Sequence, residues 1–290
     1  MTGHVGRPIM ADNRIFAEES ARMATDAFTS DDARIICDLV APGVGLVQIA
    51  RPEKRNALSL TMWQALGGAF RASSADKSIR CLILTGSGGN FSAGADISEF
   101  PTIRASAEAA RNYDEICDKA TLAIRECAIP VIAALSGVAI GGGLGLALAC
   151  DLRIADKTIR TGIPAGKLGL VYSLLDCRLL AERIGITKAK EILFTARIFG
   201  FEDAMRLGLV DRAAKADALS TAKELAAEIA GNAPMSIAGS KAILNAVSDG
   251  TATAREGELQ SFVDAAFDST DYAEGVRAFA DRRAPRFTGA

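Results

Sequence analysis

The stretch AALSGVAIGGGLGLALAC, Ala133 to Cys150, decides the fold and the candidate chemistry of this chain. An apolar run typical of a buried strand breaks at three glycines and resumes with good helix formers. This pattern predicts a strand, a tight turn and a buried helix at about 142–149. Because Gly141, Gly142 and Gly143 have no Cβ atom, a ligand can approach the backbone there closely. The first N–H groups of a helix have no partner within it and favour an oxygen that carries negative charge.

A second turn of similar composition lies upstream, in FSAGADI, Phe91 to Ile97, after an apolar strand. Two backbone N–H donors from two such turns can grip one carbonyl oxygen, so the pair predicts an oxyanion hole. Two other interpretations compete with this one. A dinucleotide-binding fingerprint needs a further glycine, and Leu148 occupies its place after Gly143 and Gly145. The glycines could also serve only to let a helix pack closely on a strand.

The composition excludes several classes of function. The 290 residues carry a net charge of −2. The sequence has neither the basic stripe of a nucleic-acid-binding protein nor a polybasic segment that would bind a membrane surface. The only histidine is His4, so catalysis by a serine–histidine or cysteine–histidine pair is excluded, and nearly all zinc sites with it. We expect no metal and no membrane span. Six cysteines are scattered without C-x-x-C spacing, which predicts reduced thiols and a cytoplasmic location; they are Cys37, Cys81, Cys117, Cys127, Cys150 and Cys177.

The predicted elements divide the chain into an N-terminal extension, an α/β core and a helical C-terminal region. We expect a polar extension over 1–33, the core over 34–215 and the helical region over 216–290. Strands predicted at 35–40 and 44–50 form a hairpin, and Ser59 is a good N-cap for the helix that follows. Further strands at 79–85, 130–135 and 151–155 alternate with helices at 105–126 and 142–149. From Leu174 onward the chain is predicted to be almost entirely helical.

Four segments occur in the order typical of one family: RPEKRNAL at 51–58, FSAGADISEF at 91–100, IGGGLGLALACDLRIA at 140–155 and FTARIFGFEDAMRLGLVD at 194–211. From about residue 34 to the end, the chain resembles the crotonase superfamily, the enoyl-CoA hydratase/isomerase family. The resemblance implies a spiral core of ββα units with a helical trimerisation region, assembled as a homotrimer or a dimer of trimers. It also implies an acyl-CoA thioester as substrate, with coenzyme A as part of that substrate and no separate cofactor.

The resemblance also assigns roles to individual residues. The backbone N–H groups of Ala95 and Gly142 would form the hole for the thioester oxygen. Coenzyme A would be held by a basic loop, by two residues beside the adenine and by two residues near the C-terminus; these are Lys54, Arg55, Asn56, Ala57, Asp96, Ile97, Phe279 and Arg282.

The departure from the family concerns acid–base chemistry. Family hydratases place glutamates where this chain has Gly145 and Ala165. Hydration needs a carboxylate to activate water and an acid to protonate the α-carbon, so we expect weak or non-standard hydratase activity. Tyr172 falls where decarboxylating relatives carry a tyrosine, which leaves decarboxylation of a malonyl-type thioester as one alternative. A non-catalytic acyl-CoA binding protein is the other.

Other carboxylates could replace the missing pair. Glu99, Asp114, Glu115 and Asp176 are within plausible reach, but each is expected to be a solvated charge on a helix or loop. Asp114 and Glu115 are the strongest of these candidates, because the resemblance places their helix beside the acyl pocket.

Overall fold

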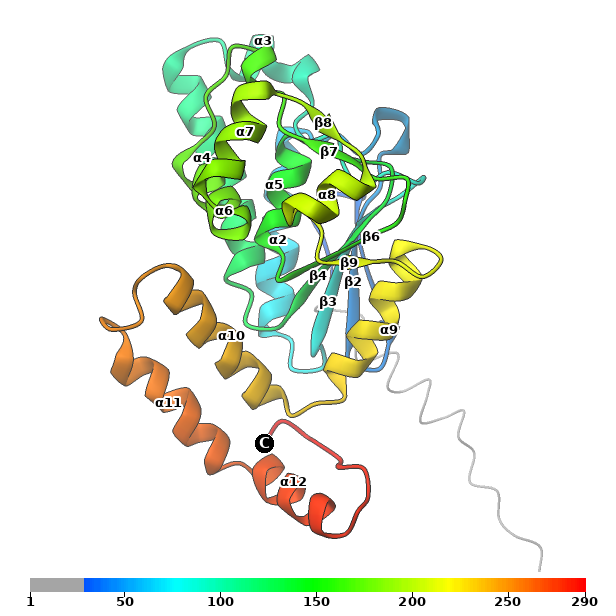
Figure 1. Ribbon diagram of the computed structural model, residues 1–290, viewed down its shortest axis with the longest axis vertical. Helices are drawn as coiled ribbons and strands as arrows, with labels where there is room; N and C mark the ends of the chain where they lie inside the picture. The colour runs from blue at the N-terminus through cyan, green and yellow to red at the C-terminus, as the bar shows by residue number, and fades with distance from the viewer. Residues whose placement is uncertain (1–28) are drawn as a thin grey trace, which may run out of the picture.

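A computed structural model describes residues 29–290, so that most of the predicted N-terminal extension, with His4, lies outside the described residues. Figure 1 shows strands and helices mixed in the upper body and helices alone in the lower. The strands are β1 Ile35–Ala41, β2 Val44–Ile49, β3 Cys81–Gly86, β4 Val131–Leu135, β5 Val138–Ile140, β6 Leu152–Ala155, β7 Arg160–Gly162, β8 Ile198–Phe199 and β9 Arg212–Ala213.

The α-helices are α2 Leu60–Ala75, α3 Phe100–Ile103, α4 Ala107–Arg125, α5 Gly142–Ala149, α6 Leu174–Ile184, α7 Ile186–Thr195, α8 Phe201–Leu207, α9 Ala218–Ala230, α10 Pro234–Ser248, α11 Glu256–Phe267 and α12 Thr270–Ala280. Three short 3-10 helices are η1 Pro52–Lys54, η2 Ile97–Glu99 and η3 Ala165–Lys167.

Two sheets organise the core. The larger sheet has the order β1-β2-β3-β4-β6-β9, in which β1 is antiparallel to β2 and the other neighbours are parallel. The smaller sheet has the order β5-β7-β8. The predicted α/β class is confirmed, as are the hairpin between β1 and β2 and the Ser59 cap, whose hydroxyl accepts from the N–H of Met62.

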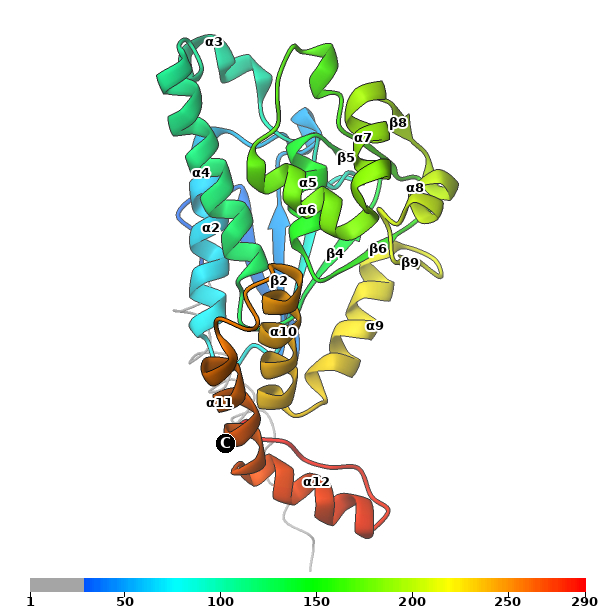
Figure 2. The ribbon, with the colours of Figure 1, turned by 60° about the vertical axis from the view of Figure 1, so that its left-hand side comes forward.

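Side chains of the large sheet alternate between two separately packed faces, as expected for strands buried on both sides. Leu82 and Leu84 of β3 face the main core with α2, α4, α5 and α6, whereas Cys81 and Ile83 face α9. Figure 2 shows α2 and α4 side by side along one side of the sheet and α9 on the other. The large sheet is therefore a fixed platform, and loops at its edge carry the site.

The glycine-rich stretch holds one more break than its sequence pattern predicts. The apolar run splits at Ser136 and Gly137 into β4 of the large sheet and β5 of the small sheet, and Gly137 adopts a positive φ of 57°. The predicted helix at 142–149 is confirmed as α5. The prediction of an almost entirely helical chain after Leu174 is confirmed apart from β8 and β9, whose two-residue lengths leave no periodicity to detect.

The last three helices form an arm below the core (Figure 1). The Lys241 ammonium on α10 lies 2.7 Å from the Asp151 carboxylate, and the Arg125 guanidinium on α4 lies 2.6 Å from Asp249 at the end of α10. These ion pairs fix the base of the arm. No helix within residues 29–290 is long and apolar enough to cross a bilayer.

Candidate functional site

The turn before α5 and the loop 91–97 meet at Gly94. A Cβ atom on Gly94 would lie 2.7 Å from the carbonyl oxygen of Ile140 and 2.8 Å from the nitrogen of Gly142. Gly94 and Gly141 also have positive φ angles of 86° and 59°, which favour glycine. Only glycine at position 94 therefore lets the two turns approach so closely.

The N–H of Ala95 is turned away from the neighbouring segment. Leu58 bridges the loop by donating to the carbonyl of Gly94 and accepting from the N–H of Asp96. This is a parallel pattern that uses the residues on either side of Ala95. Within residues 29–290, neither the Ala95 N–H nor the Gly142 N–H has a hydrogen-bond partner, and both residues line one pocket. Two free donors from two turns therefore face the same cavity.

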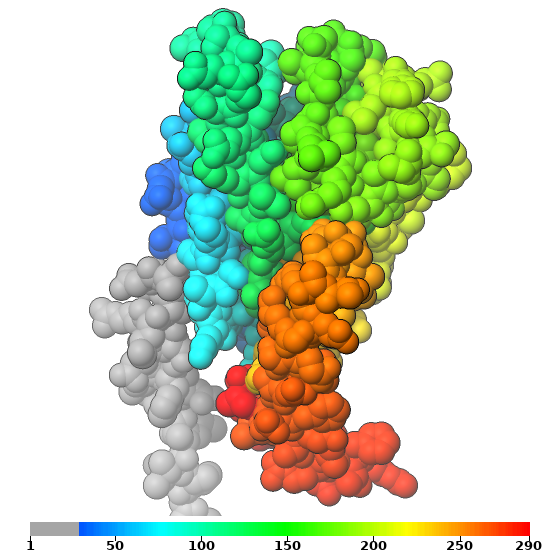
Figure 3. Space-filling model, turned by 90° about the vertical axis from the view of Figure 1, so that its left-hand side faces the viewer, coloured from blue at the N-terminus to red at the C-terminus, as the bar shows by residue number. Residues whose placement is uncertain are grey.

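This pocket encloses about 160 Å³ and lies between the α3–α4 segment and the segment from η3 to α6. Figure 3 shows a hollow between the teal segment around α3 and α4 and the green segment beyond it. Its walls are largely apolar, with Trp63, Phe100, Tyr113, Leu168, Leu170 and Val171 among them. A pocket with such walls suits a small apolar ligand that is oriented by a few polar groups of the protein.

Two aromatic residues lie beside the predicted hole. The Tyr172 hydroxyl lies 3.2 Å from the position of a Cβ on Gly141, and the Trp63 ring lies 3.2 Å from that of a Cβ on Gly142. Burial, with the Asp176 charge nearby, raises the pKa of Tyr172, so its hydroxyl stays protonated at neutral pH. Tyr172 can thus donate a hydrogen bond at the mouth of the hole.

Three carboxylates line the same pocket, and they differ in their ion-pair and hydrogen-bond partners. Asp114 is paired with Arg104 at 2.7 Å, and the Arg104 guanidinium also lies over the ring of Tyr113. Asp118 accepts a hydrogen bond of 3.0 Å from the Ser173 hydroxyl. Burial raises the pKa of Asp118 against the effect of that bond.

Asp176 is the third carboxylate, and its position is unusual. Its Oδ1 lies 3.1 Å from the place that a Cβ on Gly145 would occupy. Burial above all, and then the charge of Asp118, raises the pKa of Asp176 to about 7. A carboxylate with that pKa can both accept and donate a proton near neutral pH.

The basic loop that was predicted to hold coenzyme A has two kinds of residue. Lys54 and Arg55 are exposed, and Lys54 reaches Asp96 at 3.2 Å. Asn56 is fully buried, and its amide donates to the carbonyls of Ser87 and Asn90. Its side chain holds the loop in shape and has no surface left for a ligand.

Asp96 and Ala57 are also internal. Asp96 is 5 % exposed and bonds to Arg51, Lys54 and Ser98; although burial opposes the shift, these bonds hold its pKa at about 2. Ala57 is 7 % exposed. In contrast, Ile97 is 52 % exposed and lines the pocket. Lys54, Arg55 and Ile97 are therefore the side chains of this group that remain accessible.

Residues 40–290 match the family described as enoyl-CoA hydratase/isomerase. The chain belongs to this family. It is 38% identical over 248 residues to a Thermus thermophilus protein with the provisional name enoyl-CoA hydratase, covering 84% of this chain and 97% of the relative. It is 32% identical to a short-chain-enoyl-CoA hydratase of Clostridium acetobutylicum, covering 83% and 92%.

A solved structure agrees with this placement. A provisionally assigned enoyl-CoA hydratase/isomerase family protein of Hyphomonas neptunium superimposes with a TM-score of 0.85 at 39% identity, covering 90% of this chain and all of the other. The crotonase fold expected from the sequence is thus confirmed.

Two residues predicted for the family's coenzyme A site do not reach this pocket within one chain. Phe279 lies on α12 and Arg282 just beyond it, at the far end of the arm (Figure 1). Phe279 is 88 % exposed and lines a different hollow. Within one chain α12 packs on α11 and on the C-terminal tail, away from this pocket, so the role of Phe279 and Arg282 in binding coenzyme A stays a prediction.

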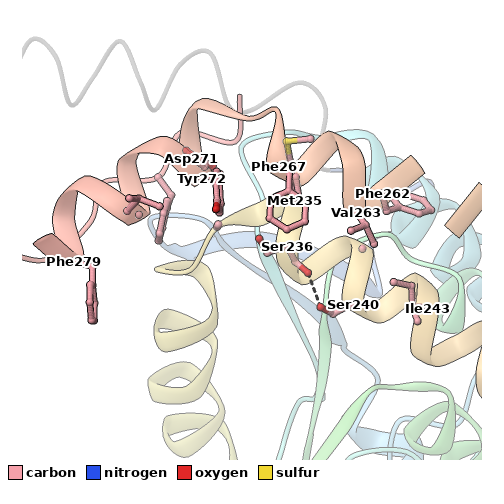
Figure 4. Close-up of a pocket in the computed structure, with 16 residues that line it drawn as sticks. Met235, Ser236, Ser240, Ile243, Phe262, Val263, Phe267, Asp271, Tyr272 and Phe279 are labelled. Atoms are coloured by element: carbon pink, nitrogen blue, oxygen red, sulfur yellow. Dashed lines mark hydrogen bonds between the residues drawn. The ribbon is translucent and has the colours of Figure 1, made fainter. Parts of the chain in front are cut away.

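That second hollow is an apolar groove of about 580 Å³ between α10, α11 and α12. In Figure 4, Met235 and Ile243 come from α10, Phe262 and Phe267 from α11, and Tyr272 from α12. The Ser240 hydroxyl inside it donates to the backbone carbonyl of Ser236 at 2.7 Å. The groove is lined mainly by apolar side chains, and the carboxylate of Asp271 at its edge accepts from the backbone N–H groups of Thr288 and Gly289.

The prediction that Asp176 is a solvated charge was wrong, because its carboxylate lines the pocket beside Gly145. Asp118 lines the same pocket and was missed in the sequence. Glu115 is exposed and pairs with Lys119, while Glu99 accepts from the N–H of Leu60. Residues 114, 117, 118 and 121 lie three or four positions apart, on one face of a helix. This spacing predicts that one face of α4 forms a wall of the pocket.

Proposed function

We propose that this protein is an enzyme that binds a short-chain acyl-CoA thioester and stabilises its enolate in an oxyanion hole. The observation that carries the proposal is that the N–H groups of Ala95 and Gly142 line one pocket and have no hydrogen-bond partner within residues 29–290. In a site shielded from water, two fixed donors stabilise developing negative charge strongly; removal of one such donor costs other enzymes roughly 3 to 4 kcal/mol.

The size of the pocket supports a short acyl group. A cavity of about 160 Å³ is close to one that holds benzene, so roughly six carbon atoms fit. Lys54 and Arg55 at the surface supply positive charge for the phosphates of coenzyme A. Coenzyme A is part of the substrate, and enolate chemistry requires no separate cofactor or metal. The free cysteines support the expectation of a reducing, cytoplasmic compartment.

We propose that ordinary hydration of an enoyl-CoA is weak. The places where the resemblance puts two glutamates hold Gly145 and Ala165, and neither can activate water. Decarboxylation of a malonyl-type thioester is the second candidate, since the Tyr172 hydroxyl lies beside Gly141. Asp118 and Asp176, which form no salt bridge within residues 29–290, disfavour it, because their ionised forms would repel the carboxylate of such a substrate.

The test is incubation of the full chain with butyryl-, crotonyl-, but-3-enoyl- and malonyl-CoA in D₂O, read by mass spectrometry, with binding measured by calorimetry. We expect binding with α-deuterium exchange or a shift of the double bond, and little gain of water. Loss of CO₂ would support the decarboxylase, whereas binding without any mass change would support a non-catalytic acyl-CoA binding protein. If none of the four thioesters bound, the proposal would fail.

A further inference from the structure

The volume that a side chain at position 145 of α5 would enter is bordered by a carboxylate from α6. Gly145 is three residues after Gly142 and lies on the same face of α5, about 4.5 Å further along the axis. Side chains on a helix lean toward its N-terminus, so a side chain at 145 would lie over the turn that holds the Gly142 N–H. Asp176, on α6, has its Oδ1 3.1 Å from the Cβ position of residue 145. A bulkier residue at 145 would displace it.

Among the pocket carboxylates, only that of Asp176 forms neither a salt bridge nor a hydrogen bond of ordinary length within residues 29–290. Asp114 is paired with Arg104, and Asp118 accepts a hydrogen bond from the Ser173 hydroxyl. No lysine or arginine within residues 29–290 forms a salt bridge with Asp176. The charged or titratable groups around it are Asp114, Cys117 and Asp118 on α4, Tyr172, Cys177 and the paired Arg104.

Helix capping does not account for this carboxylate. Asp176 is the third residue of α6, and the Ser173 hydroxyl already accepts from its backbone N–H at 3.2 Å. In a capping box the acidic side chain would return to the backbone N–H of Ser173. Within residues 29–290, no backbone N–H donates to the Asp176 carboxylate. Its side chain lines the pocket instead.

We propose that Asp176 is the catalytic acid–base residue of this pocket, moving a proton at the α-carbon of the bound acyl group. The inference rests on the proposed acyl-CoA site. Asp176 takes the proton, the C–H electron pair becomes the C=C bond of the enolate, and the charge moves to the thioester oxygen between the Ala95 and Gly142 N–H groups. The proton then returns to the α-carbon or, in an unsaturated chain, to the γ-carbon, which shifts the double bond.

One carboxylate is sufficient for this sequence, because the same group accepts and returns the proton. Addition of water needs a second group to activate the water. We therefore expect proton transfer on acyl-CoA to be the main reaction in this pocket and hydration to be much slower.

The experiment compares three proteins on but-3-enoyl-CoA in D₂O: the unchanged chain, Asp176→Asn and the control Glu115→Gln. Glu115 lies on α4, outside the pocket, and pairs with Lys119. We expect deuterium exchange and isomerisation to fall at least about 100-fold in Asp176→Asn and to stay within twofold in Glu115→Gln. The affinity, measured by calorimetry, should change less than threefold. Exchange by the unchanged chain should rise with pH through about 7 and lose this dependence in Asp176→Asn.

Each outcome has one meaning. If the unchanged chain fails to bind the thioester, the proposed function fails. If it binds and exchanges, but Asp176→Asn exchanges equally fast, Asp176 is not the base and the proposed function stands. Binding without exchange by the unchanged chain also overturns the role of Asp176 while leaving a binding site. Circular dichroism checks the fold, and Asp176→Ser replaces Asp176→Asn if the latter does not fold.

Discussion

The Asp176 carboxylate lies 3.1 Å from the position that a Cβ atom on Gly145 would occupy. The two residues are on different helices, α6 and α5, yet both border one volume beside the two donor turns. A side chain at 145 and a carboxylate at 176 cannot both occupy it without displacement. The absence of a side chain at 145 therefore leaves room for the Asp176 carboxylate in its observed position.

This relationship predicts that the carboxylate can be relocated. In Asp176→Ala, exchange on but-3-enoyl-CoA should fall about 100-fold or more. Adding Gly145→Glu to Asp176→Ala should recover at least tenfold, because the new side chain enters the vacated volume. Gly145→Glu alone should be impaired and less stable, since its Cβ meets Asp176 and a second carboxylate enters the pocket. Circular dichroism checks that the double variant folds. If it folds and exchange does not recover, the catalytic group does not lie in the shared volume.

The backbone donor at 142 can be tested by deleting its hydrogen. Gly142 is the first residue of α5, a position that accepts proline, and Gly142→Pro removes the N–H. Gly142→Ala is the matched control, because it keeps the N–H and adds the same contact with Trp63. We expect kcat for exchange to be about 100-fold lower in Gly142→Pro than in Gly142→Ala. Equal rates in the two variants would remove Gly142 from the hole.

The raised pKa of Asp176 also makes a prediction about stability. A group whose pKa rises on folding to about 7 favours the folded state at low pH, and this contribution is lost as the pH rises through about 7. Asn stays neutral, so Asp176→Asn should raise the melting temperature more at pH 8 than at pH 5. Thermal melts at both values, with Glu115→Gln as the control, measure the difference. An equal shift at the two pH values would mean that the folded-state pKa is not raised.

The apolar groove on the arm predicts self-association. Phe279 is 88 % exposed and Phe267 59 %, and burying such a side chain contributes roughly 2 kcal/mol. The family resemblance implies that a second copy covers this face in a homotrimer or a dimer of trimers. Phe279→Asp should shift the chain toward the monomer in analytical ultracentrifugation, whereas Arg277→Gln, on the same helix, should not. A chain that is monomeric without any substitution would contradict the prediction.

Local patterns in the sequence were sufficient for much of the architecture. Apolar strand segments, the Ser59 cap and the glycines at 141–143 predicted the hairpin, the alternation of strands and helices, and α5, because each depends on neighbours within a few residues. The family segments added the crotonase fold and the candidate hole. The short strands β8 and β9 were missed, since two residues show no period.

By itself, the sequence determined the fold class, the two donor turns and the lack of a glutamate at 145 and 165. Only the tertiary structure decided what stands in their place. Asp176 looked like a solvated helix charge, because 31 positions separate it from Gly145 and no local pattern relates them. Packing of α6 against α5 brings the carboxylate to the glycine, and burial beside Asp118 then sets its pKa near neutrality. The location of an acid–base group and its proton affinity are properties of that packing, which residue type and spacing do not encode.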